Sequence, residues 1–383
     1  MTPDQRNYGL DVYRLLAMVM VTSLHVICQH YGLTGNRDNT CSWIIWNVIH
    51  IFCFCAVDCF ALLTGFLSVD KRLSTSGRPY DSRWFKKFVS FWITASLFGI
   101  VICVMSLPRA DFHAAVKTAI HMLCPLTVGG GWWYVSAYLG MLLLLPLVQN
   151  GITNLSRRSL LVLVSVLLLG FSVIPTFMHS EGALAIEDGY STLWLLVMFL
   201  VGVALRENWE TILNFKHLNA FLTLGLALSL LPQYILFFGC SYLNIKGTTF
   251  LTSYISPCCV LQAICLLILC SKIRVHCERI QLILAFCSKH ALGIYLLQCH
   301  PVLWLTFFSN AKKHGLISFS ESLWRVSTLI LAFVLAGIVT YYVILMIQRY
   351  LGVNRLVSWV FEKYGTYSER VAFARSNTES QRH

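Results

Sequence analysis

Charged residues are scarce in this chain. They make up 12% of its 383 residues, whereas 57% are hydrophobic. A soluble domain has about 25% charged residues. This composition excludes an ordinary soluble enzyme and indicates an integral membrane protein.

Several sequence signatures of catalytic and metal sites are missing. The chain has no Gly-x-Ser-x-Gly elbow for a serine nucleophile and no paired Cys-x-x-Cys set for zinc. The run Gly129–Gly131 is not followed by the Lys-Ser/Thr of a phosphate-binding loop. Most of the fifteen cysteines lie in apolar runs, where cysteine behaves as a small hydrophobe. We therefore expect no metal site, no disulfide framework and no permanently bound cofactor.

Long apolar segments are abundant. A helix needs about 20 apolar residues to cross the hydrocarbon of a membrane. Ten segments qualify: 10–31, 43–68, 85–107, 133–149, 159–177, 190–205, 218–238, 250–271, 290–309 and 323–348. The sequence thus predicts an all-α, polytopic membrane protein of about ten transmembrane helices. We expect one membrane-embedded domain over 1–360 and a polar, disordered cytoplasmic tail over 361–383.

Lysine and arginine are distributed unequally between the two sides of this arrangement. Of the 29 such residues, 21 fall on the side of the termini, seven fall on the other side, and Arg14 lies within a helix. Positive charge accumulates in cytoplasmic loops, so we expect both termini in the cytoplasm. The net charge of +12 then fits a protein beside anionic lipid and requires no nucleic-acid partner.

The first apolar segment, Leu10 to Tyr31, contains three ionisable residues, Asp11, Arg14 and His25. Charges in a bilayer are costly and usually face a protein interior or a wet cavity. Arg14 and His25 are eleven positions apart, which places them about 20° from each other around a helix and about 16 Å apart along it. Asp11 lies within about 60° of both. This spacing predicts a polar track on one helix face.

Two other groups of residues are candidates for function. Asp58 lies deep in the second segment, so it either pairs with a cation such as Arg14 or stays protonated, and its role can be structural or chemical. Arg83, Lys86 and Lys87 cluster at the start of the third segment. They can serve topology alone, or they can bind the phosphates of a nucleotide such as the end of coenzyme A.

Four motifs occur in the order typical of one family. They are Leu10-Asp11-x-x-Arg14-x-x-Ala17 with His25, Val57 to Leu67, Trp133-Tyr134 with Tyr138, Leu145 and Pro146, and Gly293 to Leu297 with His300-Pro301. On these motifs the chain resembles the membrane acyltransferase-3 family over most of its length, up to about residue 360.

The resemblance implies an O-acyltransferase in the bacterial inner membrane. The donor is expected to be acyl-CoA, with acetyl preferred over succinyl, and the acceptor a hydroxyl of a cell-envelope or exported carbohydrate or glycolipid. The implied catalytic residues are His25 as general base, with Arg14, Asp11 and Asp58. The implied donor residues are Arg14, Arg83, Lys86 and Lys87, although the family usually has arginine pairs where this chain has two lysines.

A transporter or flippase is the alternative. Arg14 and Asp58 would then form a substrate or ion site near the middle of the membrane. The sequence shows no internal repeat, and its basic cluster lies on one side only, which favours the enzyme. The sequence does not identify the acceptor or the oligomeric state.

Overall fold

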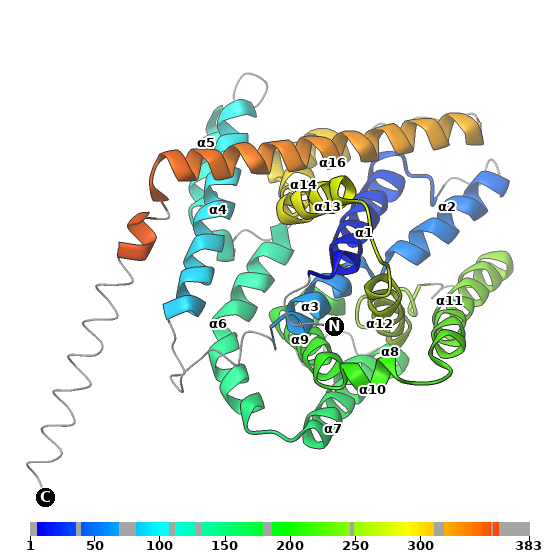
Figure 1. Ribbon diagram of the computed structural model, residues 1–383. Helices are drawn as coiled ribbons and strands as arrows, with labels where there is room; N and C mark the ends of the chain where they lie inside the picture. The colour runs from blue at the N-terminus through cyan, green and yellow to red at the C-terminus, as the bar shows by residue number, and fades with distance from the viewer. Residues whose placement is uncertain are drawn as a thin grey trace, which may run out of the picture.

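The computed structural model describes residues 6–35, 40–68, 82–106, 112–127, 132–178, 186–245, 249–309, 318–353 and 355–359. Every regular element in these ranges is helical (Figure 1), which confirms the all-α prediction. The predicted tail over 361–383 lies outside the described residues.

Each of the ten predicted segments contains a helix. In order these are α1 (Tyr8–Leu24) continued by the π-helix η1 (His25–His30), α2 (Thr40–Cys53) with α3 (Ala56–Phe66), α4 (Ser82–Ser106), α6 (Trp133–Thr153), α7 (Arg157–Leu168) with η5 (Leu169–Val173) and α8 (Ile174–Met178), α9 (Thr192–Glu207), α11 (Leu218–Leu243), α12 (Pro257–Ser271), α13 (Glu278–His290) with α14 (Leu292–Gln298), and α16 (Phe319–Tyr350). Short elements connect them: α5 (Phe112–Met122), η3 (Pro125–Thr127), η7 (Glu187–Gly189), α10 (Trp209–Leu213), α15 (Pro301–Trp304) and η8 (Leu305–Ser309).

Fewer of these helices than predicted have the length and composition to cross a membrane. Seven do within the described residues, or eight if the bent pair α13–α14 is one span. The helices α9 and α12 have only 16 and 15 residues, or about 24 and 22 Å, against a hydrocarbon thickness of about 30 Å. Most residues of both helices are buried, so these two helices form the interior of the protein.

The predicted single helix over 290–309 is wrong. The helices α13 and α14 meet at an angle of 44°, and the chain breaks again before α15. There the Nδ1 atom of His300 accepts a hydrogen bond from the backbone N–H of Val302 at 3.3 Å, and Pro301 is the first helical residue. Proline has no N–H to continue a preceding helix but fits the first turn of a new one. The segment therefore consists of short helices that turn around the core.

The helix α1 lies in the middle of the bundle, against α3, α12, α13, α14 and α16 (Figure 1). Its start is fixed by Asn7, whose side chain accepts a hydrogen bond from the N–H of Gly9 at 2.9 Å and donates one to the carbonyl of Ser271 at 3.1 Å. Further along, the Tyr13 hydroxyl donates to the carbonyl of Ala263 at 2.9 Å. These bonds attach one face of α1 to α12. The rest of α1 is therefore turned toward its other neighbours, which include α13, α14 and α16.

Two glycines allow α3 and α9 to pack backbone to backbone. A Cβ atom added at Gly65 would lie 1.9 Å from the carbonyl oxygen of Phe199, and one added at Gly202 would lie 2.0 Å from that of Leu62. Small residues permit such close approach of membrane helices. This contact joins α3 to the buried helix α9 and so fixes the position of α3 beside α1.

We predict that Gly202→Ala destabilises the protein by about 1–3 kcal/mol, because the new methyl group would overlap a backbone carbonyl that cannot move freely. Gly239→Ala is the matched control, since a Cβ atom there meets nothing within 4 Å. The measurement is thermal unfolding of the purified proteins in detergent. Equal melting temperatures for Gly202→Ala and wild type would contradict the packing of α3 on α9.

Candidate functional site

A cavity of about 440 Å³ opens beside α1. Its wall comes from α1, α3, α4, α6, α13, α14 and α16, together with Tyr254 just before α12. The ionisable or polar side chains on the wall include Arg14, His25 and Lys289, and five tyrosines line it as well. It is therefore a polar and aromatic chamber inside an otherwise apolar bundle.

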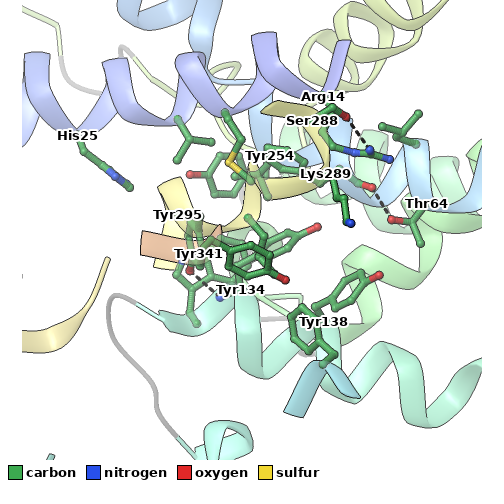
Figure 2. A pocket seen from close by; sticks show the side chains of 18 residues that line it. Arg14, His25, Thr64, Tyr134, Tyr138, Tyr254, Ser288, Lys289, Tyr295 and Tyr341 are labelled. Atoms are coloured by element: carbon green, nitrogen blue, oxygen red, sulfur yellow. Dashed lines mark hydrogen bonds between the residues drawn. The ribbon is translucent and has the colours of Figure 1, made fainter. Parts of the chain in front are cut away.

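Arg14 and His25 both line this cavity, as the predicted polar track requires, but the third predicted member of the track, Asp11, does not. Figure 2 shows them at its opposite ends, with His25 alone at one end and Arg14 beside Ser288 and Lys289 at the other. Eleven residues of helix separate them, or about 16 Å. A long, narrow substrate can therefore contact both.

Arg14 is held in place by α13. Its Nη1 atom donates a hydrogen bond to the Ser288 hydroxyl at 2.8 Å and lies 3.9 Å from the nearest Asp11 oxygen. Its side chain remains 32% exposed. The guanidinium group is thus fixed in orientation and still accessible from the cavity.

Asp11 does not line the cavity. Its two carboxylate oxygens accept hydrogen bonds from Nε and Nη2 of Arg6, both at 2.8 Å, and this pairing raises the pKa of Arg6. Asp11 therefore makes its two short hydrogen bonds with Arg6 and only a longer 3.9 Å contact with Arg14. The structure places Asp11 as a support behind Arg14 rather than among the cavity side chains.

His25 lies where α1 becomes a π-helix, a local widening that often marks a functional position. Its ring makes an edge-on contact with Trp304, with centroids 5.1 Å apart, and a second with Phe308 at 6.0 Å. Its Nδ1 atom is 3.8 Å from the Cys299 sulfur. One side of the imidazole is therefore packed against α15 and η8, and the other side borders the cavity.

Gln298 lies next to the His25 ring and is fully buried. Within the described chain, neither its amide oxygen nor its amide nitrogen makes a hydrogen bond of ordinary geometry. Burying an amide without a hydrogen-bond partner costs free energy, so a buried Gln298 side chain that lies beside His25 without such a bond is unusual. Nothing in the local sequence marks Gln298 as a site residue, and the packing of α14 against α1 brings it to His25.

Asp58 is buried in α3 and does not line the cavity, although its neighbour Val57 does. One carboxylate oxygen accepts a hydrogen bond from Nε1 of Trp194 at 2.9 Å, and the other has no partner among the described residues. The predicted pairing with Arg14 is wrong, because Arg14 contacts Asp11 and Ser288 instead. The remaining alternative is a protonated Asp58, since a buried carboxylate with a single neutral donor would be costly.

Of the predicted donor residues, Arg14 lines the cavity, whereas Lys86 and Lys87 do not. Lys86 and Lys87 are exposed, and Nζ of Lys86 donates a hydrogen bond to the Ser358 hydroxyl at 2.7 Å. The side chain of Arg83 lies outside the described residues. Phe91, about one turn further along α4 than Lys87, does line the cavity. The basic end of α4 therefore adjoins the chamber without forming it.

Lys289 is a cavity residue that the four motifs do not include, and in the sequence it is one of the 21 lysines and arginines on the side of the termini. The helix α13 begins earlier than the predicted segment and ends at a bend, which places Lys289 on the cavity wall. Tyrosines were partly foreseen, since Tyr134, Tyr138 and Tyr295 belong to the recognised motifs. The N–H of Tyr134 donates to the Tyr295 hydroxyl at 3.2 Å, which joins α6 to α14.

The two late histidines have structural contacts. The Nδ1 atom of His300 caps α15, so its Nε2 carries the proton and donates to the carbonyl of Gly99 at 3.1 Å. The Nδ1 atom of His290 donates to the carbonyl of Phe286 at 2.7 Å. Neither histidine lines the cavity.

No group of three or more His, Cys, Asp or Glu side chains in the described ranges could hold a metal ion. The side chains on the cavity wall supply an imidazole, a guanidinium, an ammonium, phenol hydroxyls and the hydroxyls of Ser288 and Thr64.

Comparison with known proteins identifies the family. Searches of curated proteins and of solved structures found no match. A family model described as "Acyltransferase domain" matches residues 7–349, which include every residue that lines the cavity. Because the match spans most of the chain and agrees with the four motifs, the protein belongs to the membrane acyltransferase-3 family.

Proposed function

We propose that this protein is a membrane O-acyltransferase that moves an acyl group, acetyl in the first instance, from cytoplasmic acyl-CoA to a carbohydrate hydroxyl. The carbohydrate would be a cell-envelope or exported glycan or glycolipid, and the membrane a bacterial inner membrane. The observation that carries the proposal is the placement of Arg14 and His25 at opposite ends of one cavity in an acyltransferase-family protein.

His25 would act as general base. A neutral imidazole accepts the proton of the acceptor hydroxyl while the oxygen attacks the thioester carbonyl. The tetrahedral intermediate then breaks its carbon–sulfur bond, and the proton passes from the imidazolium to the departing thiolate. No covalent acyl-enzyme is required, and no metal or bound cofactor takes part.

The oxyanion of this intermediate needs a hydrogen-bond donor. The Tyr134 hydroxyl supports such a role, because it belongs to a cavity residue and has no hydrogen-bond partner in the described chain. Tyr254 and Tyr295 supply further hydroxyls on the same wall.

The donor would enter from the end of Arg14. In this arrangement the nucleotide lies near the basic start of α4, at Lys86, Lys87 and Arg83. The pantetheine arm passes Arg14, and the thioester reaches His25. The acceptor hydroxyl enters from the opposite end of the cavity, so the two substrates meet at the imidazole.

The transporter alternative lacks its site. It requires Arg14 and Asp58 to act together, but Asp58 is bonded to Trp194 behind the cavity wall. The two residues share no ion pair in the part of the chain that the structure describes. We therefore retain the enzyme as the proposed function.

We predict that His25→Ala lowers the transfer rate by about 10²–10⁴-fold and leaves acetyl-CoA affinity nearly unchanged, because the base acts on the acceptor. Arg14→Ala should weaken both donor binding and turnover. The measurements are donor affinity by calorimetry and transfer from labelled acetyl-CoA, in detergent. His217→Ala is the control, since His217 is exposed and outside the cavity.

Folding should survive Arg14→Ala, because Asp11 keeps its pair with Arg6. Monodispersity and melting temperature check this before activity is interpreted. Substantial transfer by a folded His25→Ala protein would remove His25 as the base.

The basic start of α4 gives a separate prediction. Replacing Lys86 and Lys87 together by Gln should weaken acetyl-CoA binding several-fold, with a loss that shrinks as salt concentration rises. The matched control is Lys216→Gln, an exposed lysine away from the cavity. If wild type bound acetyl-CoA and a phosphate-free acyl-pantetheine equally well, the phosphate assignment would be refuted.

The orientation of the chain is also testable. We expect residues 71–80 and the C-terminal tail in the cytoplasm, because 21 lysines and arginines lie on that side. Fusions of reporters that are active on only one side of the membrane, placed in each segment, measure this. A periplasmic signal from either fusion would reverse the proposed donor side.

A further inference from the structure

Two cations from different helices face the cavity at the end away from His25 (Figure 2). Arg14 comes from α1 and Lys289 from α13. The residue before Lys289 is Ser288, whose hydroxyl accepts the 2.8 Å hydrogen bond from Arg14. The helix α13 therefore orients the guanidinium and places its own ammonium group beside the same chamber.

Positive charge exceeds negative charge at this end of the cavity. No carboxylate side chain in the described residues lines the cavity. Asp11, behind the wall, accepts two 2.8 Å hydrogen bonds from Arg6 and lies 3.9 Å from Arg14, so one carboxylate is shared by two guanidinium groups. Lys289 forms no hydrogen bond or ion pair with any residue that the structure describes. Clustered cations that outnumber the nearby carboxylates in a partly enclosed site favour an anionic ligand.

The distance between Arg14 and His25 limits which anionic ligands could contact both residues. Arg14 and His25 are separated by about 16 Å of helix. In coenzyme A, the arm between the diphosphate and the sulfur has about thirteen bonds and extends roughly 15 Å, by the geometry of an extended chain. A thioester at His25 would therefore place the diphosphate beside Arg14 and Lys289.

We propose that Lys289 and Arg14 together bind the diphosphate of the donor, which makes Lys289 a further donor-binding residue. The assignment rests on the proposed acyl-CoA donor. The guanidinium supplies a planar pair of donors and the ammonium a compact charge, which are complementary ways to hold adjacent phosphates. Lys86 and Lys87, which lie outside the cavity wall, would bind the 3′-phosphate of the nucleotide.

Three ligands test this assignment on the purified full-length protein in detergent. They are acetyl-CoA, acetyl-dephospho-CoA, which lacks only the 3′-phosphate, and acetyl-pantetheine, which has no phosphate. We expect Lys289→Met to lower the affinity for acetyl-CoA and for acetyl-dephospho-CoA by the same factor, about tenfold or more. The affinity for acetyl-pantetheine should not change. Lys289→Arg should restore most of the affinity. The control is Lys272→Met, an exposed lysine that bonds to Asn219 away from the cavity.

The outcomes separate this proposal from the proposed function. Unchanged acetyl-CoA affinity in both Lys289→Met and Lys289→Arg, with wild type binding well, would overturn the role of Lys289 and leave the donor standing. A wild type that binds none of the three ligands would overturn the acyl-CoA donor itself, and the role of Lys289 with it.

An anionic lipid headgroup offers the same phosphate chemistry as the donor. Titration with phosphatidylglycerol distinguishes the two sources. If the lipid bound wild type and not Lys289→Met, while acetyl-CoA bound both equally, the cation pair would be a lipid site and the proposal would be wrong. Weaker acetyl-CoA binding by Lys289→Met, with lipid binding unaffected, supports the donor assignment.

Discussion

The structure depends on one electrostatic constraint: a helix at its centre carries an arginine and a histidine that cannot be exposed to hydrocarbon. Arg14 and His25 both lie on the side of α1 that faces the cavity, while Tyr13 and Gly9 attach other parts of α1 to α12. The surrounding helices then enclose a polar chamber around that side. The cost of burying these groups is reduced because the chamber is accessible and lined with hydroxyls.

The walls of the chamber need close and rigid packing. The helices α3 and α9 approach through Gly65 and Gly202, and α14 and α16 approach through Gly293 and Gly337, whose added Cβ atoms would meet the facing backbone within 2.4 Å. Contacts of this kind leave little freedom for either helix pair to shift. The side chains that α3 and α14 present to the cavity are therefore held in fixed positions.

Different ends of the cavity suit different chemistry. The end at Arg14 is positively charged and held by Ser288, whereas the end at His25 is bordered by Trp304 and Phe308. Between them lie aromatic side chains, with Trp133 stacked on Tyr254 at 6.0 Å. In the proposed reaction the charged part of the donor lies at the first end and the acceptor hydroxyl at the second, so that the reacting groups are held together.

The sequence by itself determined the membrane class, the helical fold and the shared face of Arg14 and His25, because hydrophobic length and helical periodicity are local properties. It also identified the family through motifs that lie on α1, α3, α6 and α14. Only the tertiary structure decided that Asp58 bonds to Trp194, that Asp11 pairs with Arg6, that Gln298 lies next to His25, and that Lys289 lines the cavity. The contacts of Asp58 and Gln298 join segments far apart in the chain, and the place of Lys289 depends on the bend after His290. The Asp11–Arg6 pair is local, but Arg6 precedes the helix and so falls outside its periodicity. Periodicity within one segment contains no information about any of them.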